Sequence, residues 1–252
     1  MNSSILITLA VAGLGCLLAA QTTVQANGSP RVGAPAVAVA PPAVSEKREP
    51  AELLRYSINW PSGLSLGEGT LTAMREGEGW SFSLNLEAAV PGFPVQENVR
   101  SKASAGYCSS EMEKKIVRGK RKTEEKTEFD DTKHIATRKT LNGGKSELSL
   151  NQCAKDALTY VFFLRRELAQ GRLVPRQKIY YGAGYEVRVD FMGTQAIRIA
   201  EGTVQADRLV GTIKGPVSEA TVDMFFARDA ARTPLLVSVP LALGKFSMEI
   251  VR

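Results

Sequence analysis

Alternation of apolar and polar side chains limits the fold of this chain more than any other feature. In residues 80–87, WSFSLNLE, the large apolar side chains occupy every second position. The same period of two recurs in three further runs (56–60, 185–191 and 246–250). This period is typical of strands with one buried face. Turn sequences such as Asn142-Gly143-Gly144 separate the runs at short intervals, which favours antiparallel hairpins over crossover connections.

One segment, residues 156–171, has helical periodicity instead. Asp156 is a suitable N-cap, and Gly171 suits the position just after a helix. Four apolar residues form a stripe along one face (Ala157, Val161, Leu164 and Leu168). The charged residues 165–167 lie toward the other side. The sequence therefore predicts a mainly β fold, an antiparallel curved sheet (half-barrel or sandwich) with one amphipathic helix packed on it.

The first 26 residues predict export. Residues 5–20 form an uninterrupted apolar run, which at about 16 residues is shorter than the roughly 20 of a membrane-spanning helix. Val24-Gln25-Ala26 then has the small-x-small pattern of a cleavage site. We expect a signal peptide in residues 1–26. The exported protein would be secreted to the periplasm or associated with the cell envelope, and would not be an integral membrane protein after signal removal.

The same segment allows a second interpretation. Gly15 precedes Cys16, as a small residue precedes the acylated cysteine of a lipoprotein, so lipidation of Cys16 is an alternative to cleavage after Ala26. Residues 27–52 are rich in Pro and Ala and contain no aromatic residue, which predicts a disordered linker. Residues 53–252 are then expected to form a single β-rich domain.

Two cysteines, Cys108 and Cys153, remain after cleavage. Because an exported chain meets an oxidising compartment, we expect a disulfide between them, with two free buried thiols as the alternative. No metal site is expected, since His134 is the only histidine and two separated cysteines cannot complete a tetrahedral site. No cofactor is expected either, because no stretch matches the complete phosphate-loop pattern; Gly144-Lys145-Ser146 lacks the first glycine, since position 139 is Lys.

The chain is basic, with a formal net charge of +6. A basic exported protein meets anionic lipid, lipopolysaccharide and acidic polysaccharide rather than nucleic acid, although the charge can also serve solubility alone. Residues 111–139 mix both charges and predict a long, solvated β-ribbon whose Lys-rich edges discourage association. Four of its cations form a candidate anion patch (Arg118, Lys120, Arg121 and Lys122). Glu124 and Glu125 are expected to neutralise that patch in part.

Catalytic motifs are tempting but lack their context. Residues 63–67 match G-x-S-x-G around Ser65, yet a strand pattern rather than a helix follows. His134 lies three residues from Asp131 in a charged segment without an apolar frame for a triad. Four acids flanked by apolar residues remain formal candidates for a pair of glycosidase carboxylates (Asp190, Asp207, Asp223 and Asp229). We predict no catalytic residue, and read these acids as strand-face and turn residues.

Several stretches in order resemble a bacterial exported family, the domain-of-unknown-function family 3108. They are residues 56–60 leading to Gly67-Glu68, the helix with Asp156-Ala157-Leu158 and Phe162-Phe163-Leu164-Arg165, and the ending from residues 228–234 to 249–251. Arg232-Thr233-Pro234 departs from the Arg-Leu-Pro of many members, and the cysteine pair is not a general feature. The resemblance implies an exported β-rich domain with one helix, and it offers no catalytic motif to transfer.

Together these features favour a non-catalytic binding or assembly factor for an apolar or amphiphilic envelope molecule. A curved sheet under an amphipathic helix is similar to lipoprotein carriers, which is a likeness of fold only. The first alternative is a structural or protein-interaction module of the envelope, with a partner docked on an edge strand. The second alternative is an envelope hydrolase that uses carboxylates. Lipid or another envelope component is therefore the expected partner.

Overall fold

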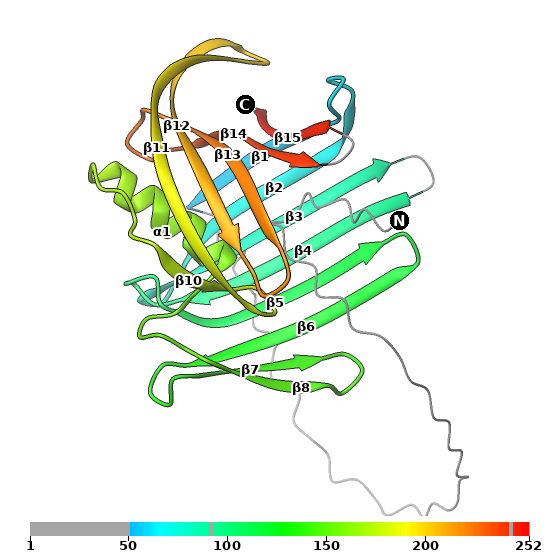
Figure 1. The fold of residues 1–252 in the computed structure, drawn as a ribbon, viewed down its shortest axis with the longest axis vertical. Coiled ribbons are helices and arrows are strands. Elements are labelled where there is room, and N and C mark those ends of the chain that lie inside the picture. Colours follow the sequence, from blue (N-terminus) through cyan, green and yellow to red (C-terminus); the bar gives the residue numbers. More distant parts are fainter. Residues whose placement is uncertain (1–50, 91–92, 242–243, 252) are drawn as a thin grey trace, which may run out of the picture. The chain divides into compact units, whose positions relative to one another are not determined.

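The computed structural model describes residues 51–90, 93–241 and 244–251 (Figure 1). In these residues the chain forms fifteen strands and one helix. The elements are β1 (Glu52–Asn59), β2 (Ser65–Glu76), β3 (Gly79–Val90), β4 (Phe93–Ala103), β5 (Ser109–Arg118), β6 (Arg121–Asp130), β7 (Ile135–Thr140), β8 (Lys145–Ser149), β9 (Lys155–Asp156), α1 (Ala157–Ala169), β10 (Gln177–Tyr180), β11 (Gly184–Ile199), β12 (Gly202–Lys214), β13 (Glu219–Ala227), β14 (Pro234–Leu241) and β15 (Gly244–Val251).

All fifteen strands belong to one sheet of order β8-β7-β6-β5-β4-β3-β2-β1-β15-β14-β13-β12-β11-β10-β9. β1 to β8 and β10 to β15 are two antiparallel meanders, which the antiparallel pair of β1 and β15 joins. Only β9 runs parallel to its neighbour, β10. The prediction of a mainly antiparallel curved sheet with one helix is confirmed. Short turns explain the topology, because they can connect antiparallel neighbours but not parallel ones.

The two edges of the sheet, β8 and β9, do not pair with each other in the described part of the chain. The sheet curls until β10 nevertheless reaches β8, where the Tyr180 hydroxyl donates a hydrogen bond of 2.8 Å to the Ser149 carbonyl oxygen. The ring of Tyr180 also packs edge-on against Phe129 of β6, at 6.1 Å between centroids. One face of β4 to β7 therefore lies inside the curl, and we call it the inner face.

The helix begins and ends as the sequence predicts. The Asp156 side chain accepts from the backbone N–H groups of Leu158 and Thr159, and Gly171 follows with φ +71°. Phe162 stacks on Phe82 of β3 at 4.1 Å between centroids, which fixes the helix on the sheet. In this part of the chain no helix combines the length and the apolar character that a membrane crossing requires.

The prediction that Arg165 lies on a polar, solvent-facing side of the helix is wrong, because Arg165 is only 5% exposed. Its guanidinium binds both carboxylate oxygens of Glu52 at 2.7 Å and donates to the Ala231 carbonyl oxygen at 3.0 Å. Val161 of the predicted apolar stripe is, conversely, only half-buried. The start of β1 and the turn after β13 cover this side of the helix, and a pattern within the helix contains no information about them.

The predicted solvated ribbon is correct for one face only. β5, β6 and β7 belong to the main sheet, and their inner face buries apolar side chains (Met112, Phe129 and Ala136). Their outer face carries ion pairs between strands, such as Lys126 with Glu111 at 2.6 Å and Lys139 with Glu128 at 3.3 Å. A charged strand of period two can thus have one solvated and one buried face.

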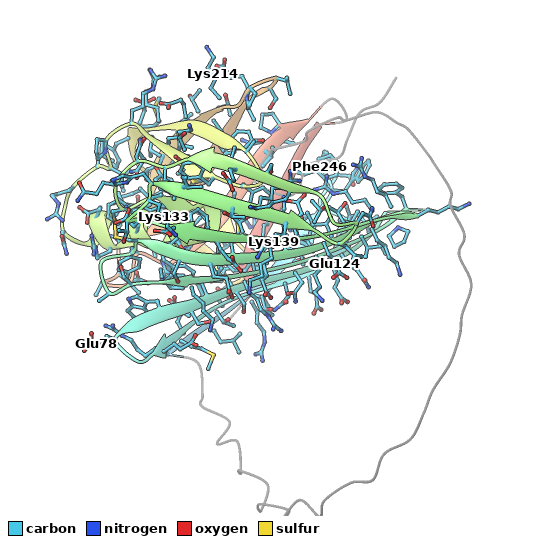
Figure 2. All side chains as sticks on the ribbon, turned by 90° about the horizontal axis from the view of Figure 1, so that it is seen from below. Glu78, Glu124, Lys133, Lys139, Lys214 and Phe246 are labelled. Carbon is cyan, nitrogen blue, oxygen red and sulfur yellow. A yellow bond between two sulfur atoms is a disulfide. The ribbon has the colours of Figure 1, made fainter. Side chains whose placement is uncertain are left out.

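Two apolar clusters fill the curl. The larger lies beneath the helix and continues through β10 to β14. The smaller one contains five buried residues (Ile58, Leu66, Leu86, Ala88 and Phe246). It lies toward the end of the sheet that carries the β1–β2, β3–β4 and β5–β6 turns, which we call the distal end. Figure 2 shows Phe246 toward this end and Glu78 and Lys133 toward the opposite end.

Candidate functional site

Ionisable side chains meet on the inner face where the turn between β10 and β11 covers it. Glu97 (β4), Lys114 (β5), Glu125 (β6) and Arg138 (β7) each point inward from neighbouring strands. Lys114 lies opposite Glu125, and Glu97 and Arg138 share this face two positions away in register. Tyr181 enters from the turn. We call these five residues the interior ionic cluster. It is the densest group of buried charges among the described residues, and hence the first candidate for a site.

Glu125 is the centre of this cluster. Lys114 Nζ lies 3.0 Å from Glu125 Oε2. Arg138 donates two hydrogen bonds to the same carboxylate, from Nε at 2.8 Å and from Nη2 at 2.5 Å. The side chains of Lys114 and Glu125 are only 8% and 6% exposed. Two cations on one buried carboxylate leave its oxygen atoms fully engaged.

Tyr181 closes the second part of the cluster. Its hydroxyl donates a hydrogen bond to Glu97 Oε1, and Lys114 Nζ lies 4.3 Å from the centre of its ring. The other oxygen of Glu97 lies 3.8 Å from a guanidinium nitrogen of Arg118. Glu97 and Tyr181 are 2% and 4% exposed. The turn is thus tied to β4 and β5 by charged and aromatic contacts at once.

The environment shifts the pKa values of these groups. Burial lowers the pKa of Lys114, and the nearby charge of Glu125 only partly opposes this effect. Burial would raise the pKa of Glu125, but the hydrogen bond from Arg138 and the charge of Lys114 outweigh it, so that pKa is lowered. Burial and then the Glu97 carboxylate hold the pKa of Tyr181 well above its usual value. Shifted lysine and tyrosine groups are common in active sites, and equally in structural ion networks.

The turn packs closely onto these groups from inside the curl. Gly182 has φ +76°, and a Cβ atom at this position would lie 3.0 Å from Lys114 Nζ and 3.2 Å from Glu125 Oε2. The turn backbone therefore rests directly on the charged atoms. A general acid or base must come within hydrogen-bond reach of its substrate. The geometry indicates that the cluster fastens the curled sheet at this turn.

Two hollows stand out among the described residues, and one of them borders the centre of the cluster. One, of about 240 Å³, is lined by residues of β1, β15 and the turn before β14 (Leu53, Leu54, Arg55, Thr233, Ile250 and Val251). The other, of about 290 Å³, follows β5 to β7, and its lining includes Lys114 and Glu125 of the cluster as well as charged residues of the outer face. Both are smaller than the roughly 300–1,000 Å³ typical of ligand pockets.

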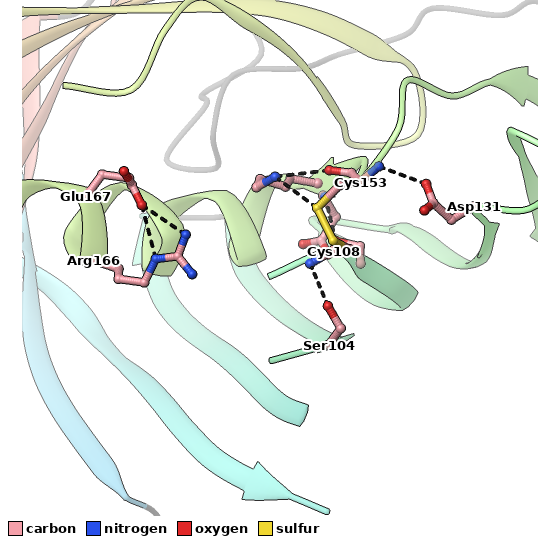
Figure 3. Close-up of a disulfide and its surroundings, with 9 residues drawn as sticks. Ser104, Cys108, Asp131, Cys153, Arg166 and Glu167 are labelled. Carbon is pink, nitrogen blue, oxygen red and sulfur yellow. Dashed lines mark hydrogen bonds and ion pairs between the residues drawn. A yellow bond between two sulfur atoms is a disulfide. The ribbon is translucent and has the colours of Figure 1, made fainter. Parts of the chain in front are cut away.

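Cys108 and Cys153 form a disulfide, as the sequence predicts, with 4.5 Å between their Cα atoms (Figure 3). The bridge joins the turn before β5 to the segment that leads into β9 and the helix. Cys153 has φ +52°, and its N–H donates to Asp131 at 2.8 Å. Lys155 Nζ donates to the Cys153 carbonyl oxygen at 3.0 Å. The disulfide and these two hydrogen bonds fix the segment that leads into β9 and the helix.

Asp156 continues the same anchor. Its carboxylate is fully buried and accepts five hydrogen bonds, two of them from the hydroxyls of Ser101 at 2.8 Å and Ser109 at 2.6 Å. The remaining three come from the N–H groups of Leu158 and Thr159 and from the Thr159 hydroxyl. Sequence reasoning identified the N-cap. It missed the two serines, which come from β4 and β5 and are identified only by tertiary pairing.

The structure separates Ser65 and His134, the pair that the nucleophile motif would need. Ser65 is exposed at the start of β2 and contacts the Ser57 hydroxyl at 3.1 Å. His134 is exposed with φ +54° in the turn before β7, at the opposite end of the sheet. The strand prediction after Ser65 is thus consistent with β2, and no triad geometry joins these two residues.

The four candidate acids are engaged with other groups and not with one another. Asp223 contacts Arg208 at 2.7 Å and Lys245 at 2.8 Å, and these cations outweigh burial so that its pKa is lowered. Asp207 binds Arg232 at 2.6 Å. Asp190 makes an ion pair with Arg188, and Asp229 accepts a hydrogen bond from the Thr233 hydroxyl. Among the described residues no group of His, Cys, Asp and Glu is placed to hold a metal ion.

The remaining predictions concern the N-terminal region. Cys16, the signal peptide in residues 1–26 and the linker up to residue 50 lie outside the described residues. β1 begins at Glu52, next to the expected start of the domain at residue 53.

Comparison with known proteins agrees with this fold. The crystal structure of a β-barrel-like protein of domain of unknown function DUF1849 from Brucella abortus matches with a TM-score of 0.58. It shares 8% identity, and the match covers 79% of this chain and 95% of that one, so the likeness concerns the fold alone. No curated protein matches the sequence. The profile of the family described as "Protein of unknown function (DUF3108)" matches residues 55–251, nearly the whole sheet, and the chain therefore belongs to this family.

Proposed function

We propose that the protein is an exported, non-catalytic binding or assembly factor of the cell envelope that holds an amphiphilic partner on its outer surface. The observation that carries this proposal is the filled interior. Side chains of two apolar clusters and the interior ionic cluster occupy the curl. A carrier that encloses an acyl chain needs an apolar cavity, whereas here Gly182 packs onto Lys114 and Glu125. Binding at the surface agrees with this packing, and binding inside does not.

The non-catalytic part of the proposal rests on how the polar groups are used. Lys114 and Tyr181 have the shifted pKa values of possible acid–base groups, but both are bonded to carboxylates beneath the turn. The acids that a glycosidase mechanism would need are each paired with other residues. These arrangements support a rigid scaffold.

A protein-interaction module is the second candidate, because β8 is an open edge of the sheet. Leu150 N–H donates to the His134 carbonyl oxygen, so the residues at odd positions of β8 turn their backbone groups away from β7. Ser149 already accepts from Tyr180, which leaves Glu147 and Lys145 at the edge. Two charged residues on a short edge discourage strand addition. This geometry favours the surface-binding proposal over edge docking.

Native mass spectrometry and flotation with vesicles test the proposal together. The exported protein, purified without detergent, is expected to have the mass of the protein alone and to float with vesicles made from envelope lipids. A lipid that stays bound one to one through gel filtration would show that the interior opens, and would overturn the surface-binding proposal. Failure to float with any vesicle, together with a cross-linked protein partner, would favour the interaction module instead.

A further inference from the structure

The turns at the distal end of the sheet form a continuous surface. Cross-strand pairs link Ile58 with Gly67, Gly67 with Ala88, Ala88 with Val95, and Val95 with Arg118. These five residues form one row across β1 to β5, close to the ends of the strands. The β1–β2 and β5–β6 turns, the end of β3 and the start of β4 therefore lie at the same end of the sheet, as Figure 1 shows.

Large apolar side chains are exposed on this surface. Leu64 in the β1–β2 turn is 66% exposed, and Phe93 at the start of β4 is 39% exposed. The ring of Phe93 lies over the β5–β6 turn, because a Cβ atom at Gly119 would come within 2.7 Å of it. Trp60 packs edge-on against Phe246 at 4.7 Å and connects the turns to the smaller apolar cluster. Trp60 thus belongs to the rim of a packed cluster, and Leu64 lies in the same turn as Trp60.

Uncompensated cations lie beside these apolar groups. Lys120, Arg121 and Lys122 are exposed, and none has an ion-pair partner among the described residues. The expectation that Glu124 and Glu125 neutralise this patch is wrong. Glu125 points inside the curl, where Lys114 and Arg138 bind it, and Glu124 pairs with Lys115 at 3.5 Å. Both carboxylates are therefore engaged by other cations, although alternation places Glu124 on the same face as Lys122.

The two ends of the sheet differ in the acidic residues of their turns. Residues 60–66, 88–95 and 117–123 contain no Asp or Glu. At the opposite end of the sheet, the β2–β3 turn carries Glu78 and the β6–β7 turn carries Asp130, which pairs with Lys133 at 3.0 Å. The distal surface thus combines exposed apolar side chains with cations, and its turns contain no acidic residue.

We propose that this distal surface (Trp60, Leu64, Phe93, Lys120, Arg121 and Lys122) docks on an anionic phospholipid bilayer. Aromatic and aliphatic side chains enter the boundary between head groups and acyl chains, while Lys and Arg contact the lipid phosphates. A polyanion without acyl chains would match the three cations but not Leu64 and Phe93. The inference rests on the proposed function and deepens it, since it names the partner chemistry and the face that binds.

The two tryptophans allow the orientation to be measured, because Trp60 lies at the distal end and Trp80 begins β3 at the opposite end. The exported protein with W80F retains only Trp60, and with W60F only Trp80. Each is mixed with phosphatidylcholine vesicles, with or without one quarter phosphatidylglycerol, whose acyl chains carry bromine. Quenching of Trp60 alone, and only by anionic vesicles, is the expected result. Quenching of Trp80 instead, with none of Trp60, would place another face on the membrane and overturn the proposal.

Matched charge variants give the second readout. K120Q/R121Q/K122Q is expected to weaken binding to anionic vesicles roughly 100-fold, since each cation near the surface contributes about a factor of five. K133Q/R176Q/R188Q removes three exposed cations elsewhere and changes the net charge equally, so binding should stay within a few-fold of the unchanged protein. Equal losses in both variants would show a net-charge effect without a docking face. Thermal unfolding of each variant verifies that the fold is retained.

The apolar side chains separate a bilayer from other polyanions. L64S/F93S should lose most quenching of Trp60 while retaining the salt-sensitive attraction of the cations. Tight binding to a soluble acidic polysaccharide that L64S/F93S leaves unchanged would replace the bilayer as partner. If the protein binds neither vesicle type, the proposed function itself fails. If it binds vesicles but K120Q/R121Q/K122Q binds equally well, only the assignment of this face fails.

Discussion

Asp156 is the residue whose loss should damage the fold most for the smallest change. Its fully buried carboxylate joins the helix to β4 and β5 by five hydrogen bonds of 2.6–3.0 Å. The change D156A removes all five acceptor contacts and adds no bulk. The donors left behind are two backbone N–H groups at the helix start and three hydroxyls. The residues that carry these donors are buried, so water reaches them poorly.

The cost follows from two separate contributions. Loss of an N-cap lowers helix stability by about 1 kcal/mol, and up to about 2. Each buried donor left without a partner costs about 1–3 kcal/mol, although hydroxyls can rotate toward another acceptor. Counting the cap and the hydroxyls of Ser101 and Ser109, we expect D156A to lower the free energy of unfolding by about 4 kcal/mol. Since domains are stable by about 5–15 kcal/mol, this is a large share.

Urea unfolding followed by circular dichroism measures the effect, with the slope against urea as a check that the transition stays two-state. D156N is the matched control. It keeps one oxygen as the cap and should lose about half as much. The variant S101A/S109A removes two of the groups that donate to Asp156. Adding D156A to this variant should lower the free energy of unfolding by less than D156A does in the unchanged protein. A loss below about 1 kcal/mol for D156A, or equal losses for D156N and D156A, would refute the reasoning.

Three further outcomes are expected. Replacing Cys108 and Cys153 by serine should lower the free energy of unfolding by about 4 kcal/mol, because the bridge closes a loop across 45 residues; peptide mapping without reduction must first recover the linked pair. Burial raises the pKa of four buried tyrosines (Tyr56, Tyr160, Tyr181 and, to about 12, Tyr185). Above pH 10 these tyrosines lose their protons in the unfolded state but keep them in the folded state, so the free energy of unfolding should fall by about 1.4 kcal/mol per tyrosine and pH unit. Urea unfolding at pH 9 to 11 measures this fall. S65A and H134A should each change stability by less than about 0.5 kcal/mol, since both side chains are exposed, and should leave vesicle flotation unchanged.

The strands and the helix could be predicted because their signals are local. Residues 80–87 became the centre of β3 since a strand with one buried face must alternate, and Asp156 and Gly171 mark the helix ends through backbone requirements of their own neighbourhood. Arg165 was misassigned for the opposite reason. Its partner Glu52 is more than a hundred residues away in sequence, and no pattern inside the helix indicates which polar side chain meets a distant carboxylate.

The interior ionic cluster was missed because β5 and β6 carry charges on both faces. A period of two separates the residues of a strand into two sets, but it does not say which set is inside when both contain Lys and Glu.

The apolar residues of the same strands contained the missing information. Met112 is two positions from Lys114, and Phe129 is four from Glu125, so each apolar side chain shares a face with its charged neighbour. Since Met112 and Phe129 belong to the core, Lys114 and Glu125 must point inward as well. The same alternation sends Glu124 outward, where it pairs with Lys115, and among the described residues Lys120, Arg121 and Lys122 have no ion-pair partner.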